Sequence, residues 1–477
     1  MNCSGGSMCD GDLDILAYRR GSVSAPAGCG KTQLITSALL RSEDSKPALV
    51  LTHTNAGRAA LEQRLKRLGV SGTTARVATL DSWAIRLVQC FPQRSSLTPA
   101  VLRVQGNSAN YAEIRQAALD ILKAGHIDKI VSATYSRVIV DEYQDCGKLQ
   151  HEMILTLANL LPTVVLGDPL QVIFDFAGPV VDWHKDVVAA FPPLAWKPEP
   201  WRWNNAETPE IGDWLLNSVR PSLSQPGASI DLSKAPKGVE WIRLEGTTAQ
   251  MNETRLATAK RKFAGTALII ADSKNKESQW QTARRARATM VEANDMMDFI
   301  KFAATFDPHA QSSLDEAVHY FGNLLSGLSP ENLIARTRSL DAGRAKTEAS
   351  RIEEIALAYL RAPSHRSAAE MLDAFYDTAD VFAFRPDIMR LCSKALRAVN
   401  ETVTFHAAAM RERERFRHLP RTMRPRSVGS TLLLKGLEAD VAVILEPEKM
   451  NAKNLYVAMT RGSKQLFICS SSPILKC

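Results

Sequence analysis

The stretch APAGCGKT, residues 25–32, places two glycines and a Lys-Thr pair between the apolar run GSVS and the helical pattern TQLITSALL. A glycine-containing turn at the start of a helix lets backbone N–H groups close around phosphates. In such a turn Lys31 would neutralise the β and γ phosphates, and Thr32 would bind Mg²⁺. The sequence therefore predicts a nucleotide-binding loop, whose further contacts are Ala27, Gly28, Cys29, Gly30 and Gln33.

Two adjacent carboxylates follow a second apolar run, in VIVDEYQD at residues 138–145. Successive residues of a strand point to opposite faces, so Asp141 and Glu142 can take different tasks. We expect Asp141 to hold Mg²⁺ through water and Glu142 to polarise the attacking water. Together with the loop, this pair predicts hydrolysis of a nucleoside triphosphate.

A third apolar run, in VVLGDPLQVIFDF, ends at Asp168. Gln171, three residues later, offers an amide that can reach a γ-phosphate or its water. Phe174 and Phe176 alternate just beyond it. Such aromatic pairs are more often part of a core, but their place beside a phosphate-sensing strand favours a platform on which bases stack.

Strands and helices must position these motifs, and two regions show that alternation. The first spans residues 20–195, and the second consists of residues 266–273, 441–448 and 465–471. Residues 290–420 instead carry helical periodicity without a strand run. Parallel α/β layers bind ligands at the carboxyl ends of their strands, which is where the motifs lie. The pattern predicts an α/β protein with a helical insertion.

The composition limits which partners, metal sites and locations are to be expected. The formal charge of +8 and the pI of about 9.0 fit a polyanionic partner without demanding one. The eight cysteines are scattered and form no CxxC pair, which argues against a zinc site or a disulfide framework. The sequence has no run of 18 or more apolar residues, so we expect a cytoplasmic protein without a membrane partner.

Six stretches, taken in order, resemble those of superfamily 1 helicases of the UvrD/Rep/PcrA type. They are APAGCGKT, LTHTNAGRAALEQRL, TLDSW, VIVDEYQD, LGDPLQVIFDF, and STLLLKGLEADVAVIL together with NLYVAMTRGSKQLFI. The resemblance covers residues 25–183 and 430–471, with WKPEPWRWNN at 196–205 as a looser match. P-loop kinases and GTPases need neither KGLE nor YVAMTR, so they fit the sequence less well.

The resemblance implies an α/β fold with two RecA-like P-loop NTPase domains, whose parallel sheets are flanked by helices, and with reduced, mostly helical insertions. Residues 1–200 would form the first domain, with a short inserted subdomain at about 86–132. Residues 201–289 and 421–477 would form the second domain, and 290–420 would resemble a reduced 2B subdomain.

The resemblance also implies ATP and Mg²⁺ as the ligands, with hydrolysis between the two domains. Arg461 of YVAMTR would reach the γ-phosphate, and Gly436 and Glu438 of KGLE would lie near the ribose and phosphates. In WKPEPWRWNN, Trp201 would stack on the nucleotide base and Arg202 would contact the γ-phosphate.

In this family single-stranded DNA crosses both domains, and the enzyme moves from 3′ to 5′. The positions that would contact single-stranded or partly duplex DNA are His53, Thr54, Asn55, Trp83, Phe174 and Phe176. For Trp83, packing in the core is the favoured alternative. The arginine-rich run RERERFRHLPRTMRPR, residues 411–426, either lies along phosphates or forms a charge-alternating, solvated helix end.

The chain departs from this family at positions that bear on function. No Gln precedes Gln33, although relatives use an upstream Gln to read adenine. Leu432 replaces a DNA-contacting His, and Asp81 replaces another. A second interpretation is therefore a DNA- or nucleotide-sensing ATPase that regulates a partner nuclease. Compact chains of this kind resemble the helicase-like subunit of Gabija-type antiviral defence pairs.

Overall fold

The computed structural model describes residues 13–98, 101, 110–173, 179–417 and 424–477. The chain divides into two compact units, and each is described by itself. The first unit comprises residues 1–230, 451–460 and 476–477, and the second comprises 231–450 and 461–475. Residues 201–230, which the resemblance assigns to the second RecA-like domain, pack within the first unit.

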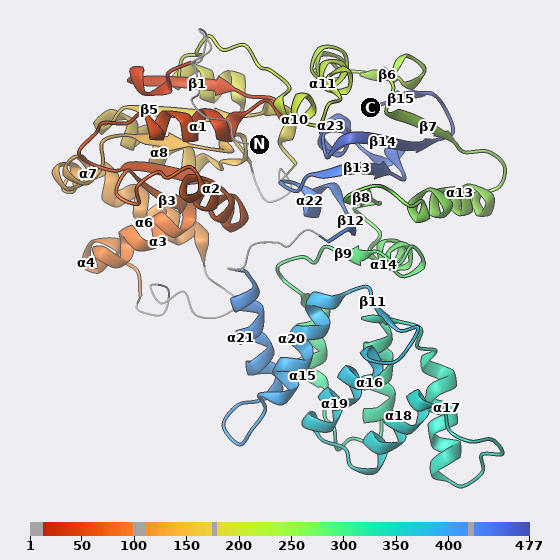
Figure 1. Cartoon of the computed structure of the whole chain (residues 1–477). Coiled ribbons are helices and arrows are strands. Elements are labelled where there is room, and N and C mark those ends of the chain that lie inside the picture. The colour runs from red at the N-terminus through yellow and green to blue at the C-terminus, as the bar shows by residue number, and fades with distance from the viewer. Residues whose placement is uncertain (1–12, 99–100, 102–109, 174–178, 418–423) are drawn as a thin grey trace. The chain divides into compact units, whose positions relative to one another are not determined.

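The first unit contains a five-stranded parallel sheet in the order β1-β5-β4-β2-β3 (Figure 1). Its strands are β1 (Arg20–Ser24), β2 (Ala48–Thr52), β3 (Ala75–Thr79), β4 (Val138–Val140) and β5 (Thr163–Gly167). The longer flanking helices are α1 (Lys31–Leu40), α2 (Asn55–Arg67), α3 (Leu80–Cys90), α6 (Tyr111–Lys123) and α8 (Lys148–Leu160). Shorter elements are η1 (Ile15–Ala17), α4 (Pro92–Ser95), α7 (Asp128–Thr134), η2 (Tyr143–Asp145), η3 (Pro169–Gln171), η5 (Trp183–Val187), α9 (Val188–Ala190), α10 (Trp201–Asn205), α11 (Pro209–Trp214), η6 (Leu215–Val219), α12 (Arg220–Leu223) and α23 (Ala452–Met459).

Both faces of this sheet are covered, which explains why its central strands are continuous apolar runs. Val50 and Ile139 lie in the core with α1 and α2, whereas Leu49 and Val138 lie in the core with α3, α6 and α8. Every residue of β2, β4 and β5 is buried. Parallel strands that are buried on both faces lose the apolar-polar alternation of a half-exposed sheet. Their carboxyl ends share one edge, where Asp141 and Asp168 follow directly.

The second unit contains a six-stranded parallel sheet in the order β7-β14-β13-β8-β12-β9. Its strands are β7 (Val239–Arg243), β8 (Ala267–Ile270), β9 (Thr289–Met290), β12 (Arg426–Gly429), β13 (Ala439–Ile444) and β14 (Gly462–Ser470). Helices α13 (Thr248–Lys260), α14 (Lys276–Arg285) and α22 (Thr431–Leu434) belong to the same unit. With the first sheet, this confirms the predicted α/β fold with two parallel, helix-flanked sheets.

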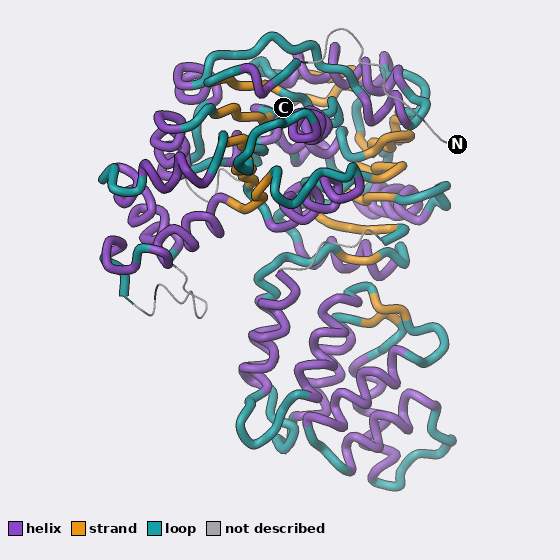
Figure 2. The backbone as a smooth tube through the Cα atoms, turned by 60° about the vertical axis from the view of Figure 1, so that its left-hand side comes forward, coloured by secondary structure: helices purple, strands orange, loops and turns teal. Residues whose placement is uncertain are grey.

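Residues 297–417 of the second unit are mostly helical, as Figure 2 shows in purple. The helices are α15 (Met297–Thr305), α16 (Ser313–Gly322), α17 (Pro330–Asp341), α18 (Arg351–Arg361), α19 (His365–Tyr376), α20 (Pro386–Arg397) and α21 (Phe405–Arg417). They enclose one apolar core of their own. The sequence pattern missed one antiparallel pair, β10 (Leu325–Ser326) with β11 (Phe382–Ala383), because strands of two residues carry no periodicity.

The arginine-rich run begins in α21, where three of its arginines are paired with carboxylates. Arg415 binds Glu412 at 2.5 Å, and Arg417 binds Glu414 at 3.1 Å. Arg413 is buried and also contacts Glu414. These pairs support the charge-alternating helix over a contact with phosphates. Within the described ranges, no helix combines the length and apolar character that crossing a bilayer requires.

A buried arginine joins the helical part of the second unit to its sheet. Arg385, between β11 and α20, binds Glu292 at 2.7 Å and Asp298 at 2.6 Å. Its guanidinium carbon also lies 4.3 Å from the centre of the Trp280 ring in α14. Glu292 follows β9, and Asp298 lies in α15, so one side chain links elements of both parts. Burial raises the pKa of Glu292, and the charge of Arg385 opposes that rise.

Replacing Arg385 by Met should lower the free energy of unfolding of the second unit by about 3–5 kcal/mol, because buried carboxylates would lose their cation. Urea unfolding followed by circular dichroism measures this loss. Arg338→Met is the matched control, since Arg338 forms an exposed pair with Asp315 and its loss should cost less than about 1 kcal/mol. Equally small losses in both variants would contradict the assigned role of Arg385.

Candidate functional site

The loop between β1 and α1 has the backbone that a phosphate cradle needs. Gly28 and Gly30 have φ angles of +71° and +88°, a left-handed conformation that favours glycine. Lys31 begins α1, and Thr32 lies half-buried in its first turn. Burial raises the pKa of the Cys29 thiol to about 12, so this side chain packs as a neutral group. The contribution of Cys29 to a phosphate site is therefore its backbone.

Lys31 joins the loop to the two carboxylates at the end of β4. Its Nζ lies 2.6 Å from Glu142 Oε1 and 3.5 Å from Asp141 Oδ1. Burial opposes the charge of Lys31, but the two carboxylates outweigh it and raise its pKa. Burial also raises the pKa of Asp141, against the effect of Lys31.

Glu142 itself has a strained backbone. Its φ of +56° lies in the left-handed region, which costs a residue with a side chain about 1–2 kcal/mol. Its N–H donates to Asp141 Oδ1 at 2.9 Å, which helps to hold this geometry. Such strain gathers at functional sites, because the surrounding contacts must maintain it.

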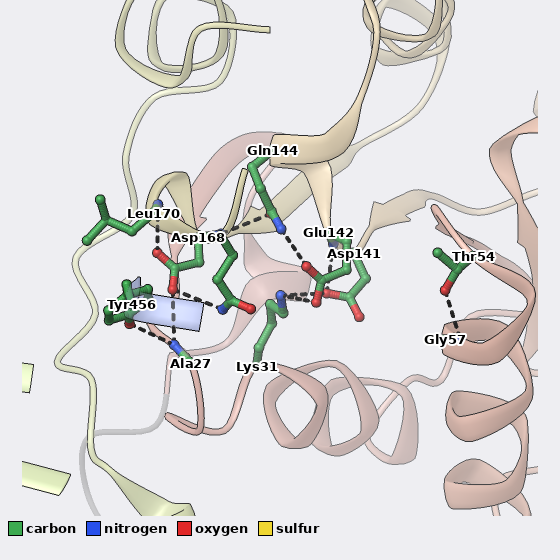
Figure 3. A network of polar contacts seen from close by, with 11 residues as sticks. Ala27, Lys31, Thr54, Gly57, Asp141, Glu142, Gln144, Asp168, Leu170 and Tyr456 are labelled. Carbon is green, nitrogen blue, oxygen red and sulfur yellow. Dashed lines mark hydrogen bonds and ion pairs between the residues drawn. The ribbon is translucent and has the colours of Figure 1, made fainter. Parts of the chain in front are cut away.

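Gln144 connects the carboxylates to the next strand end (Figure 3). Its Nε2 donates to Glu142 Oε2, and its Oε1 accepts from the Asp168 N–H at 3.0 Å. A methyl group at Gly167 would lie 2.5 Å from Gln144 Oε1, so only glycine leaves room for this bridge. The DEYQD and GDPLQ segments are therefore linked by a buried amide.

Asp168 is the centre of the polar network in Figure 3, and its side chain is fully buried. Oδ2 accepts from the Ala27 N–H at 3.1 Å and from Gln171 Nε2 at 3.0 Å. Oδ1 accepts from the Leu170 N–H at 3.2 Å and from Arg220 Nη1 at 2.6 Å. One carboxylate thus fixes the phosphate loop and the predicted γ-phosphate sensor in a common frame.

Tyr456 of α23 completes this network within the first unit. Its hydroxyl oxygen accepts from the Ala27 N–H at 3.3 Å and from Arg220 Nη1 at 3.0 Å. Burial, and then Asp168, raise the pKa of Tyr456, so the phenol stays neutral. Gln144, Arg220 and Tyr456 were not predicted from the sequence as site residues. The first and last lie inside recognised motifs, but nothing near Arg220 marks it.

The Trp-Arg-Trp segment, α10, packs directly on the phosphate loop. The Arg202 N–H donates to the Gly28 carbonyl at 3.0 Å. The Trp203 ring is 1% exposed, and a methyl group at Gly28 would meet it at 2.6 Å. Trp201 is 46% exposed beside Gly30, where a methyl group would meet Cδ1 at 2.9 Å. Trp201 therefore presents an accessible indole at the loop, whereas Trp203 is structural.

The side chains of two predicted nucleotide contacts, Arg202 and Gln33, form hydrogen bonds within the first unit. The Arg202 guanidinium donates to the Thr460 carbonyl at the end of α23. Gln33 is exposed on α1, where it donates to Ser37 at 2.8 Å and accepts from Arg64. Both side chains lie next to the loop, and their roles toward a nucleotide stay predictions.

The predicted DNA contacts differ in how far they are exposed. Thr54 is exposed, but its hydroxyl caps α2 by accepting from the Gly57 N–H at 3.0 Å. Asn55 is the first residue of α2, and His53 is half-buried before it. Trp83 is 6% exposed in the core with α6 and α8, which supports the packing alternative, and its role as a DNA contact stays a prediction. Phe174 and Phe176 lie outside the described residues.

Asp81, which stands where the family usually has a histidine, forms hydrogen bonds within the first unit. It accepts two hydrogen bonds from Arg115 of α6, at 2.6 and 2.7 Å, and one from Gln150 of α8 at 3.0 Å. This carboxylate therefore ties three helices together, a role that the usual histidine would not fill in the same way.

The second unit brings the KGLE segment and Arg461 together. Arg461 is buried, and its Nη1 donates to the Leu437 carbonyl at 3.1 Å. The Ala439 N–H in turn donates to the Arg461 carbonyl at 3.0 Å. Gly436 has a φ of +84°, and Glu438 is exposed.

Comparison with known proteins gives a family match, which covers part of the first unit. A family profile described as an AAA domain matches residues 15–177. That span holds the glycine loop, the two strand-end carboxylates and Gln171. No curated protein matches the chain. The fold, the loop geometry and this match define a P-loop NTPase.

The residues present fit a nucleotide with Mg²⁺. The left-handed glycines give the loop before α1 the backbone that a phosphate cradle uses, and Lys31 supplies a largely buried cation. The Thr32 hydroxyl and the Asp141 carboxylate are oxygen ligands of the kind that Mg²⁺ prefers, beside phosphate oxygens.

Replacing Trp201 by Ala should weaken nucleotide binding while changing the free energy of unfolding by less than about 1 kcal/mol, because the ring is largely exposed. Titration with a fluorescent nucleotide analogue measures the binding. Trp203→Ala is the matched control, and it should cost about 3–5 kcal/mol of stability because that ring is buried. Unchanged binding in Trp201→Ala would show that Trp201 does not hold the base.

Proposed function

We propose that the protein is an ATP-driven single-stranded DNA translocase and helicase of the UvrD-like type, which moves from 3′ to 5′. The observation that carries the proposal is the continuous network from Lys31 through Glu142, Gln144 and Asp168 to Gln171. It connects the predicted catalytic base with the predicted γ-phosphate sensor. A P-loop protein that only stores a nucleotide has no need of such a connection.

Lys31 and Glu142 would have different roles in hydrolysis: Lys31 would bind phosphate oxygens, and Glu142 would accept a proton from the attacking water. Lys31 contacts Glu142 Oε1, and phosphate oxygens would compete for the same ammonium group. When Lys31 turns to the phosphates, Oε1 becomes able to accept a proton from the attacking water, while Gln144 still holds Oε2. Bound to Thr32 and Asp141, Mg²⁺ would neutralise phosphate charge and orient the terminal phosphate.

Arginines would complete the hydrolytic site. The family resemblance assigns a γ-phosphate contact to Arg202 and to Arg461, and a contact near the ribose to Gly436 and Glu438. An arginine that stabilises the charge of the transition state is worth about 10³ to 10⁵ in rate in related NTPases. The link from Arg461 to Leu437 supports a common role for the YVAMTR and KGLE segments.

The DNA contacts rest on the resemblance and on the excess of positive charge. Phe174 and Phe176 would stack on bases, with His53, Thr54 and Asn55 at the backbone and the neighbouring base. Each stacking contact is worth roughly 1–3 kcal/mol and tolerates any sequence.

Lys31→Ala and Glu142→Gln should each lower ATP turnover by at least about 10²-fold, because one loses the phosphate-binding cation and the other the base. The wild-type rate should rise when single-stranded DNA is added. A phosphate-release assay with and without an oligonucleotide measures both effects. Glu152→Gln, which breaks only an exposed pair with Lys123, is the control and should keep its turnover. A wild-type rate that ignores DNA would exclude a DNA-driven motor.

A second candidate is a DNA- or nucleotide-sensing ATPase that regulates a partner nuclease. The observation in its favour is Asp81, whose carboxylate is engaged by Arg115 and Gln150 where relatives offer a histidine to DNA. Strand displacement by the purified chain alone on a 3′-tailed duplex separates the two candidates. Stimulated ATP hydrolysis without displacement favours the sensor, and displacement favours the helicase.

A further inference from the structure

Arg220 stands outside every recognised motif but contacts the centre of the site. It is the first residue of α12, and its side chain is 16% exposed. Nη1 donates to Asp168 Oδ1 at 2.6 Å and to the Tyr456 hydroxyl at 3.0 Å. Its guanidinium carbon also lies 5.6 Å from the centre of the Tyr456 ring. Arg220 therefore binds a carboxylate and a phenol that both contact the phosphate loop.

The two oxygens of Asp168 have different partners, and this gives Arg220 its importance. Oδ1 receives the guanidinium, whereas Oδ2 receives Gln171 Nε2 and the Ala27 N–H. A fully buried carboxylate without a cation takes up a proton or turns away, and either change removes an acceptor. The fixed positions of Ala27 and Gln171 then depend on the charge of Arg220.

We propose that Arg220 is a positioning residue for ATP hydrolysis, which acts through Asp168 on the amide of Gln171 and on the phosphate loop at Ala27. It also orders α23 through Tyr456. That helix ends next to Thr460, which accepts from Arg202. Arg220 thereby ties a γ-phosphate sensor, the loop and a second arginine of the site to one guanidinium group. The inference rests on the proposed function, in that it names a further residue of the same site.

The surroundings of Arg220 make a direct test feasible. It lines an open pocket of about 420 Å³ together with Lys197, Asn217 and Ser224. A small cation from solvent can therefore reach the space that a truncated side chain leaves. Guanidinium ion has the shape and charge of the missing group.

Arg220→Ala should lower the turnover number for ATP by about tenfold to a hundredfold, the effect of losing one charge-assisted hydrogen bond, and should change the Michaelis constant less. Guanidinium chloride, at concentrations below those that unfold the protein, should restore part of that turnover. It should restore none in Glu142→Gln. Arg220→Lys should fall between Arg220→Ala and wild type, and Lys123→Ala, in an exposed pair, should match wild type. A folded Arg220→Ala with turnover within about twofold of wild type would overturn the proposal.

Amide hydrogen exchange in the loop provides a readout that needs no hydrolysis. Exchange of the peptide that contains Ala27 should be faster in Arg220→Ala than in wild type, because that N–H loses its fixed acceptors. If the wild-type chain does not hydrolyse ATP, the proposed function fails, whereas faster exchange still supports positioning by Arg220. Unchanged exchange contradicts it. If Arg220→Ala does not fold, Arg220→Lys and Tyr456→Phe carry the test. Both should lower turnover while keeping the unfolding midpoint, and unchanged turnover in both overturns the proposal.

Discussion

The buried carboxylate of Asp168 is the constraint on which the nucleotide site depends. A carboxylate that is removed from water at the end of a strand must find donors for its lone pairs, or several kcal/mol are lost. Asp168 finds them in Ala27, Leu170, Gln171 and Arg220. These donors come from the loop, from its own turn and from a helix that follows much later in the chain. Their shared acceptor fixes the distances between segments that no local interaction would hold together.

The site requires glycine at several positions because neighbouring side chains pack closely there, as well as because phosphates would bind there. Gly28 lies under Trp203, and Gly30 lies beside Trp201. At Gly167 the neighbour is the amide of Gln144. Gly28 and Gly30 combine a left-handed backbone with a close approach of a tryptophan ring. Each of these two features by itself disfavours a side chain at these positions. The Trp-Arg-Trp segment is therefore part of the nucleotide site: one indole supports the loop, and the other remains accessible.

In the second unit, a buried arginine holds distant segments together, as the buried carboxylate of Asp168 does in the first unit. Arg385 binds two carboxylates and a tryptophan ring, and it secures a helical body to a parallel sheet. Arg461 and the KGLE segment are joined by a hydrogen bond to the Leu437 carbonyl. In the first unit, the charge of Asp81 likewise fastens three helices together. The departure from the family at Asp81 thus has a structural explanation.

Local sequence patterns were enough to predict most of the long strands and part of the nucleotide site. The strands β1, β2, β4, β5, β8, β13 and β14 are recognisable in the sequence, because most are fully buried and therefore continuously apolar. The half-exposed strands β3 and β7 and the two-residue β9 are not, because they show neither a continuous run nor a clean alternation. The phosphate loop and the pair of Asp141 and Glu142 could also be predicted, since their chemistry depends on residues that are adjacent in the chain.

Only the tertiary structure decided the partners of these groups. Trp83 is buried by helices from other parts of the first unit, and Asp81 is paired across three helices. Arg220 and Tyr456 meet Asp168 and Ala27 from distant positions. A hydrogen bond between residues hundreds of positions apart leaves no spacing or periodicity to read, because its geometry exists only after the strands and helices have packed.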